Sequence, residues 1–213
     1  MRVVWQNCLM YVPSRYAMTD TEAWSAVADI GAGFLVVSSA EGLRSVFVPV
    51  AVDDDRQRIF AHVARGNSWW SSARDGDQVT ALFNRAHAYV SPNYYPSKVA
   101  DPRVAPTWNY QVVEVVGHVT VRDDPAFTES VVRRLTANFE STQSEPWRVD
   151  DAPPEFVSAL VRGIVAFEIE VTSITGSAKL SQNQPTENQE RVRQELSQRG
   201  DSARTVSQLM GEL

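Results

Sequence analysis

The stretch Arg44–Val52, which reads RSVFVPVAV, alternates between two sets of side chains. Because successive side chains of a strand point to opposite faces, one face carries Val46, Val48, Val50 and Val52, and the other carries Phe47, Pro49 and Ala51. A polar turn, Asp53–Asp55, and a returning apolar run, Arg58–Val63, follow directly. Two such runs joined by a short turn predict an antiparallel β meander.

The rest of the chain extends this pattern with more strands and a few helices. Apolar or alternating runs predict further β-structure at residues 34–38, 79–84, 88–91, 109–121 and 164–174. Capping residues and apolar stripes predict helices that begin near Thr19, Asn67, Asp124, Pro153 and Thr186. Inward positions of these helices are expected to include Val131, Val132, Leu135, Phe139, Phe156, Leu160 and Val161. Six or seven strands with peripheral helices indicate an α+β fold built on a β-barrel.

The length of 213 residues suits one compact domain with small appendages. We expect an N-terminal extension over residues 1–9, the domain over residues 10–184 and a helical tail over residues 185–213, whose charges form a solvated helix face. Cys8 is the only cysteine, so an internal disulfide or a zinc knuckle is excluded and a cytoplasmic location is expected. No apolar stretch approaches the roughly 20 residues of a membrane-spanning helix.

Charge and motifs exclude several classes of function. A net charge of −6 is unfavourable for a nucleic-acid-binding protein, so a nucleic-acid partner is not expected. The sequence has no Gly-x-Gly-x-x-Gly after a strand, no P-loop and no His-Glu-x-x-His. Its three histidines are scattered, which argues against a three-histidine zinc site.

Four runs rich in aromatic and polar residues depart from the core pattern: residues 61–67, 88–98, 105–110 and 179–183. If they line the mouth of a barrel, they offer ring faces and a few directed hydrogen bonds, as pockets for flat cofactors do. The alternative is that aromatic residues beside proline and asparagine only fasten long loops. These residues alone leave both interpretations open.

Several motifs, in this order along the chain, resemble the PaiB family. They are Met10–Pro13, His62–Asn67, Tyr89–Pro92, Pro106–Tyr110, Glu145–Trp147 and Lys179–Asn183. The resemblance implies a split β-barrel of the FMN-binding type with peripheral helices, and a homodimer with the cofactor pocket at the subunit interface. The family comprises FMN-binding negative transcriptional regulators and heme-dependent piperazate synthases.

Two departures from the flavin-type pattern bear on the cofactor. The second strand carries Phe47-Val48-Pro49 where those members have His-Leu-Pro, and Gln184 stands where they have an arginine. An arginine is a natural bidentate partner for the FMN phosphate, and glutamine lacks its charge. We therefore expect heme b, with FMN as the alternative cofactor and ordinary family drift as the alternative explanation.

The resemblance also implies the site residues. The expected cofactor-binding residues are His62, Arg65, Asn67, Trp108, Asn109, Ser181, Gln182 and Asn183. His62 is expected as the axial ligand of the heme iron, with His87 and His118 as second and third choices, and a purely structural histidine as the alternative.

The expected function is a heme-dependent cyclisation of N5-hydroxy-ornithine to piperazate, which forms an N–N bond. Lys98, Tyr110 and Lys179 are the expected catalytic residues: Arg65 or Lys98 grips the substrate carboxylate, and Tyr110 or Lys179 passes the leaving proton. The partners would be a small amino-acid substrate and a second copy of the chain, with no membrane. The alternative function is an FMN-binding negative transcriptional regulator of the PaiB type.

Overall fold

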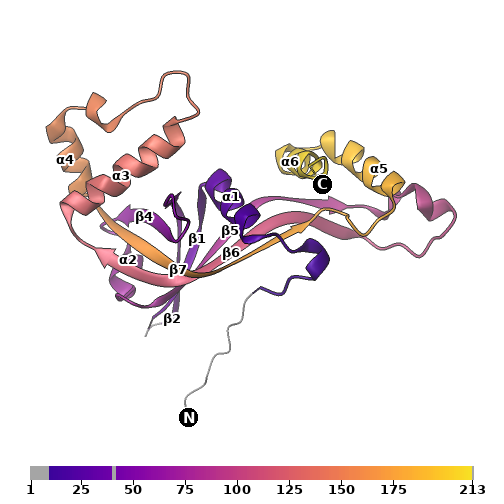
Figure 1. Ribbon diagram of the computed structural model, residues 1–213, viewed down its shortest axis with the longest axis horizontal. Coiled ribbons are helices and arrows are strands. Elements are labelled where there is room, and N and C mark those ends of the chain that lie inside the picture. The colour runs from indigo at the N-terminus through magenta and orange to yellow at the C-terminus, as the bar shows by residue number, and fades with distance from the viewer. Residues whose placement is uncertain (1–9, 40–41, 213) are drawn as a thin grey trace, which may run out of the picture. The chain divides into compact units, whose positions relative to one another are not determined.

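The computed structural model describes residues 10–39 and 42–212. Its strands are β1 (Ala32–Ser39), β2 (Gly42–Pro49), β3 (Ala51–Val52), β4 (Arg58–Ala64), β5 (Gln78–Val90), β6 (Thr107–Arg122) and β7 (Ile164–Lys179). Its helices are α1 (Asp20–Ile30), α2 (Ser68–Ser72), α3 (Pro125–Glu140), α4 (Pro154–Arg162), α5 (Thr186–Ser197) and α6 (Asp201–Met210). Short 3₁₀ turns lie at Ser14–Tyr16, Pro92–Tyr94, Pro96–Val99 and Val149–Asp151. The expected α+β class is confirmed (Figure 1). The expected 1–9 extension lies outside the described residues.

The described strands form one sheet in the order β2-β1-β5-β6-β7-β4-β3. The predicted strand Arg44–Val52 is divided, because β2 pairs antiparallel with β1 from Ala32↔Pro49 to Ser39↔Gly42, whereas β3 pairs with β4. Val50, between them, donates its backbone N–H to the carbonyl of Gly31 instead of joining a ladder. The predicted meander therefore holds for β3 and β4, and β2 takes the opposite edge of the sheet.

The chain divides into two compact units, each described here by itself. Unit 2 comprises Val27–Phe83 and Val115–Ile174. In its core Trp69 of α2 packs on Phe167 of β7, with ring centroids 4.8 Å apart. Helix α3 covers a second cluster, in which Val131 and Leu135 meet Phe60 of β4. Asp124 caps α3 by accepting from the backbone N–H groups of its first turn, as predicted.

Three apolar side chains of α3 and α4 are not inward as expected. Phe139, Phe156 and Leu160 are 42%, 53% and 56% exposed, whereas Val161 is buried. Helix α4 has only nine residues and packs against α3, so much of its apolar stripe has no described neighbour to cover it. Amphipathic periodicity alone does not show how many elements will cover a helix.

Unit 1 comprises the described residues 10–26, Asn84–Glu114 and residues 175–212. The capping box at Thr19 is confirmed: Thr19 and Glu22 exchange backbone-to-side-chain hydrogen bonds at the start of α1. The single predicted tail helix is two helices, α5 and α6, which lie side by side (Figure 1). Their apolar sides bury Val192, Leu196, Val206, Leu209 and Met210 against Ala86, Ala88 and Val90 of β5. The tail therefore contributes apolar side chains to the core of unit 1 in addition to carrying a charged outer face.

Strand β5 is continuous from Gln78 to Val90, although a gap was predicted after Asn84. Asn84 and Arg85 are both exposed, so the alternation shifts by one residue there and breaks the sequence pattern. Among the described residues, no helix combines the length and the apolar character needed to cross a membrane.

Candidate functional site

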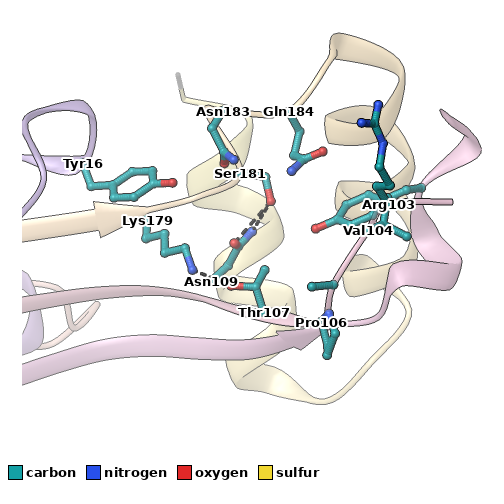
Figure 2. A pocket seen from close by; sticks show the side chains of 12 residues that line it. Tyr16, Arg103, Val104, Pro106, Thr107, Asn109, Lys179, Ser181, Asn183 and Gln184 are labelled. Carbon is teal, nitrogen blue, oxygen red and sulfur yellow. Dashed lines mark hydrogen bonds between the residues drawn. The ribbon is translucent and has the colours of Figure 1, made fainter. Parts of the chain in front are cut away.

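Unit 1 contains a cavity of about 350 Å³ between the start of β6, the end of β7 and the loop that precedes β6 (Figure 2). The strand ends contribute Thr107, Asn109 and Lys179 to its wall. The full lining is Tyr16, Tyr95, Arg103, Val104, Ala105, Pro106, Thr107, Asn109, Lys179, Ser181, Asn183 and Gln184. Most of these side chains carry a hydrogen-bonding group, so the cavity suits a polar ligand.

Two hydrogen-bonded pairs order the wall. The Asn109 amide nitrogen donates to Ser181 Oγ at 2.9 Å, and Ser181 Oγ lies 3.2 Å from Asn109 Oδ1. The same amide nitrogen lies 3.6 Å from the sulfur of Met210, so α6 supports this side chain from behind. Lys179 Nζ donates to Thr107 Oγ1 across the neighbouring strands (Figure 2). Asn109 is 0% exposed, and its position is therefore fixed by packing as well as by hydrogen bonds.

The turn after β7 is held by its own side chains. Gln182 accepts from the backbone N–H of Leu180 and donates to the carbonyl of Ala178. Ser181 has a positive φ of 68°, which an L-residue adopts at a cost. Gln184 accepts from the side chain of Asn188 in α5. Gln182 thus fastens the turn that presents Ser181, Asn183 and Gln184 to the cavity.

The cavity lining contains cationic but no acidic side chains. None of its twelve lining residues is acidic, and two of them, Arg103 and Lys179, are cations. The chain has only two lysines, Lys98 and Lys179. Arg103 is paired with Asp101, and the hydrogen bonds that Arg103 donates lower the pKa of the Asp101 carboxyl. An anionic ligand group would meet positive charge from two different segments of the chain.

The structure brings four of the sequence-predicted residues together at this cavity: Asn109, Lys179, Ser181 and Asn183. Tyr16, Tyr95, Arg103 and Thr107 were missed as site residues. Thr107 could have been found, because it shares a strand face with Asn109 by simple alternation. Arg103 lies in an irregular segment and Tyr16 in a short 3₁₀ turn, where the sequence carries no such signal.

Trp108 and Tyr110 alternate with the cavity residues along β6 and do not line the cavity. Trp108 is half-exposed and lies between two residues of β5, with ring centroids 5.9 Å from His87 and 5.9 Å from Tyr89. His87 also lies within hydrogen-bond distance of the Asn84 amide, through Nδ1. Trp108 and Tyr110 therefore lie outside the lining of this cavity, and the roles expected for them stay predictions.

Arg65 and Asn67 have structural partners in unit 2. Arg65 forms a bidentate ion pair with Asp123, at 2.9 and 2.7 Å, and also donates to the carbonyls of Arg162 and Ile164. This pairing lowers the pKa of Asp123. Asn67 caps α2 by accepting from the N–H of Trp69. Arg65 therefore uses most of its donors within the fold, and Asn67 uses its side-chain oxygen.

His62 lies on β4 in unit 2, paired with Ala166 of β7. Its Nδ1 atom is buried and has no hydrogen-bond partner among the described residues. Burial lowers the pKa of His62, so its imidazole is neutral near pH 7. His62, Arg65 and Asn67 thus belong to unit 2, whereas the cavity residues belong to unit 1.

Lys98 lines a second depression of unit 1, of about 410 Å³, with Tyr94 and Arg191 among its neighbours. Its Nζ donates to Asn93 Oδ1 at 2.6 Å. The two lysines expected to share one site are therefore in different depressions. Within the described part of the chain, no three His, Cys, Asp or Glu side chains gather to hold a metal ion.

Comparison with known proteins decides the family. Residues 10–173 match the family model described as "Putative FMN-binding domain". The chain is 27% identical over 205 residues to the "Protease synthase and sporulation protein PAI 2" of Bacillus subtilis, which covers 94% of this chain and 96% of that protein. The chain belongs to the PaiB family. This PaiB-family protein is also 31% identical over 137 residues to the uncharacterized protein AN0679 of Emericella nidulans, across 59% of this chain and 53% of that one.

Solved structures resemble this PaiB-family protein in fold. The FAD and heme binding protein of Mycobacterium smegmatis has a TM-score of 0.57 at 10% identity, over 78% of this chain and 74% of that one. The conserved hypothetical protein Rv2991 of Mycobacterium tuberculosis has a TM-score of 0.57 at 14% identity, over 82% and 94%. The flavocytochrome Anf3 of Azotobacter vinelandii has a TM-score of 0.55 at 10% identity, over 76% and 69%. The expected split-barrel fold is confirmed.

Proposed function

We propose that this protein binds flavin mononucleotide, as an FMN-binding regulatory protein of the PaiB type, and that the unit 1 cavity receives the polar phosphate-bearing arm of the cofactor. Membership of a family described by FMN binding supports the cofactor. The relative named "Protease synthase and sporulation protein PAI 2" matches this chain over 94% of its length, and this match supports a role of the PaiB type. The observation that carries the location is the absence of acidic residues and the presence of two cations in the cavity lining.

The residues present fit such an arm. A phosphate needs positive charge and several N–H or O–H donors, and Lys179, Arg103 and Asn183 supply them. Thr107 and Ser181 offer hydroxyl groups of the kind that exchange hydrogen bonds with a polyol. The volume of about 350 Å³ lies near the lower end of the range for small-molecule pockets, about 300–1,000 Å³. When bound, the flavin would supply redox or sensing chemistry, while these residues bind and orient it.

The two sequence departures that favoured heme carry less weight in this geometry. Gln184 does line the cavity, but Arg103 lines it too and offsets the charge missing at residue 184. Phe47 does not line the cavity; it lies on β2, 60% exposed, with its ring 5.1 Å from that of Phe34. The cavity is therefore neither apolar nor short of positive charge.

One observation favours the second candidate, a heme-dependent enzyme of the piperazate synthase type. His62 carries a neutral imidazole with a buried, unpartnered Nδ1 atom, and neutral imidazole is a common heme ligand. The heme would supply the N–O activation of that chemistry. Its other expected residues are divided: Lys179 lines the cavity, Lys98 the second depression, and Tyr110 neither. The FMN proposal is better supported for this reason.

We also propose that the protein is a homodimer. Phe34 of β1 faces Phe47 of β2 and Leu82 of β5 in the strand register, and all three side chains are more than 40% exposed. A contiguous apolar row of this kind favours a protein partner over water. Direct DNA contact is not part of the proposal, because the net charge of −6 opposes it.

The test is an absorption spectrum of protein produced with both flavin and heme supply, followed by an FMN titration. We expect two flavin bands, and Lys179→Met should weaken FMN binding about ten-fold or more, as loss of a charged hydrogen bond does. Lys98→Met is the matched control, because it removes the other lysine of unit 1 from outside the cavity. A Soret band without flavin bands, lost in His62→Ala, would establish the heme candidate instead.

A further inference from the structure

Arg103 is a cavity residue whose guanidinium forms hydrogen bonds along one edge only, to Asp101. It lies in the irregular segment between the 3₁₀ turn at Pro96–Val99 and β6. Its Nε atom lies 2.9 and 3.2 Å from the two carboxylate oxygens of Asp101, and its Nη2 atom lies 2.8 Å from one of them. Among the described residues, nothing bonds its Nη1 atom. The side chain is 87% exposed, so nothing fixes it apart from Asp101.

The bond to Asp101 is easily exchanged. An ion pair between exposed side chains contributes little to stability, because water screens both charges. A phosphate group carries more negative charge than a carboxylate and matches the planar guanidinium with two parallel hydrogen bonds. Asp101 therefore presents to Arg103 the same chemistry as a phosphate, in a weaker form.

The position of Arg103 means that an anion in the cavity can reach it. The residue lines the cavity together with Lys179 and Gln184, while Asp101 is not among the lining residues. Lys179 is already bonded to Thr107 on the opposite wall, and Gln184 brings an uncharged amide. Among the lining residues, Arg103 is the one with a guanidinium fork for an anion, and Figure 2 shows its head group directed away from Lys179 and Asn109, at the rim of the cavity.

We propose that Arg103 supplies the guanidinium that binds the phosphate in this cavity, beside Lys179, and that Asp101 holds it in place until a phosphate group displaces the carboxylate. This inference rests on the proposed FMN function and names the contact that would distinguish FMN from riboflavin, which lacks the phosphate. The inference predicts that substitutions of Arg103 and of Asp101 change the affinity for FMN in opposite directions. Arg103→Gln removes the fork, whereas Asp101→Asn removes the competitor and keeps the fork.

The experiment is a fluorescence titration of the full chain with FMN and with riboflavin at one ionic strength. We expect Arg103→Gln to weaken FMN binding about ten-fold or more and to leave riboflavin unchanged, as loss of one charged contact predicts. Asp101→Asn should tighten FMN binding about two- to five-fold, since the pair it removes is weak. Adding Gln184→Arg to Arg103→Gln should restore part of the FMN preference.

Arg204→Gln is the matched control. Arg204 forms an exposed pair with Asp201 at 3.3 Å in the same unit, outside the cavity lining, so its loss should leave both affinities unchanged. Circular dichroism confirms that each variant is folded. An unchanged FMN-to-riboflavin ratio in Arg103→Gln, or unchanged or weaker FMN binding in Asp101→Asn, overturns the inference and leaves FMN binding standing. A wild-type chain that binds neither flavin overturns both proposals.

Discussion

Two buried amide side chains on the same face of β6 should respond in opposite ways to substitution. Asn109 and Gln111 are 0% and 7% exposed and are two residues apart, so they share a face of the strand. Asn109 is bonded to Ser181, whereas Gln111 Oε1 has no partner among the described residues. Comparing the two positions separates the stability that a hydrogen-bonded buried amide contributes from the stability that a buried amide without a partner costs.

The magnitudes follow from these contacts. Asn109→Leu keeps the number of side-chain heavy atoms, loses the hydrogen bonding to Ser181, worth about 0.5–1.5 kcal/mol, and leaves the Ser181 hydroxyl, itself 3% exposed, without a partner at a cost of about 1–3 kcal/mol. We expect a loss of about 2–4 kcal/mol in the free energy of unfolding. Gln111→Met removes an oxygen that is desolvated without compensation, so it should be neutral or stabilising, within about 1 kcal/mol.

Urea unfolding followed by far-UV circular dichroism measures both variants. At a typical urea dependence of about 1–3 kcal/mol per molar, the Asn109→Leu midpoint should fall by about 1 M or more, and the Gln111→Met midpoint should stay or rise. An FMN titration adds a second readout, since Asn109 lines the cavity and Gln111 does not. Equal destabilisation by the two substitutions would refute the reasoning, because burial alone would then explain both.

Other features of the chain give three further predictions. A Cβ atom at Gly117 would meet the carbonyl oxygen of Glu170 and lie 2.7 Å from a side-chain carbon of Ile169, so Gly117→Ala should cost about 1–3 kcal/mol in urea unfolding, whereas Gly66→Ala, with open space around it, should not. Burial lowers the pKa of His62, so the unfolded chain binds a proton at this imidazole more readily than the folded chain, and the free energy of unfolding should fall as the pH drops below about 6.5. His62→Gln should reduce the dependence of the urea midpoint on pH between pH 7.5 and about 5.5, and equal pH dependence in the two proteins would contradict the burial argument. Light scattering at micromolar concentration should give twice the chain mass, and a monomer mass would refute the homodimer.

The fold was largely readable from local signals. Alternation located β4, β6 and β7, and the Thr19 and Asp124 caps located the starts of α1 and α3. The division of Arg44–Val52 into β2 and β3 was not readable, because both halves keep the same alternation and only long-range pairing distinguishes them. The second tail helix was missed although Gly200 separates it from α5 and Ala203, Val206, Leu209 and Met210 give it an apolar stripe of its own, which packs on β5.

The site was readable in part. Motif position indicated Lys179, Ser181 and Asn183, which do line the cavity, but it also grouped Trp108 with Asn109, although neighbours in a strand face opposite ways. Arg65 was assigned to a ligand because its partner Asp123 lies 58 residues away and no local pattern links them. Arg65 differs from Arg103 in that backbone carbonyls, those of Arg162 and Ile164, hold it in addition to its carboxylate partner.

The residues of the cavity wall come from two parts of the chain, one inside the matched domain and one after it. Arg103 and Thr107 come from within the matched domain, residues 10–173, whereas Lys179, Ser181 and Gln184 follow it. The second group is fixed by the Gln182 turn and by α5, which packs on the unit 1 core. Because PAI 2 matches this chain over 94% of its length, the relationship extends beyond the domain model. A change of charge on one wall, such as glutamine at residue 184, can then be offset by a cation on the other, so we expect the preference of this chain for an anionic cofactor to depend on the summed charge of both walls.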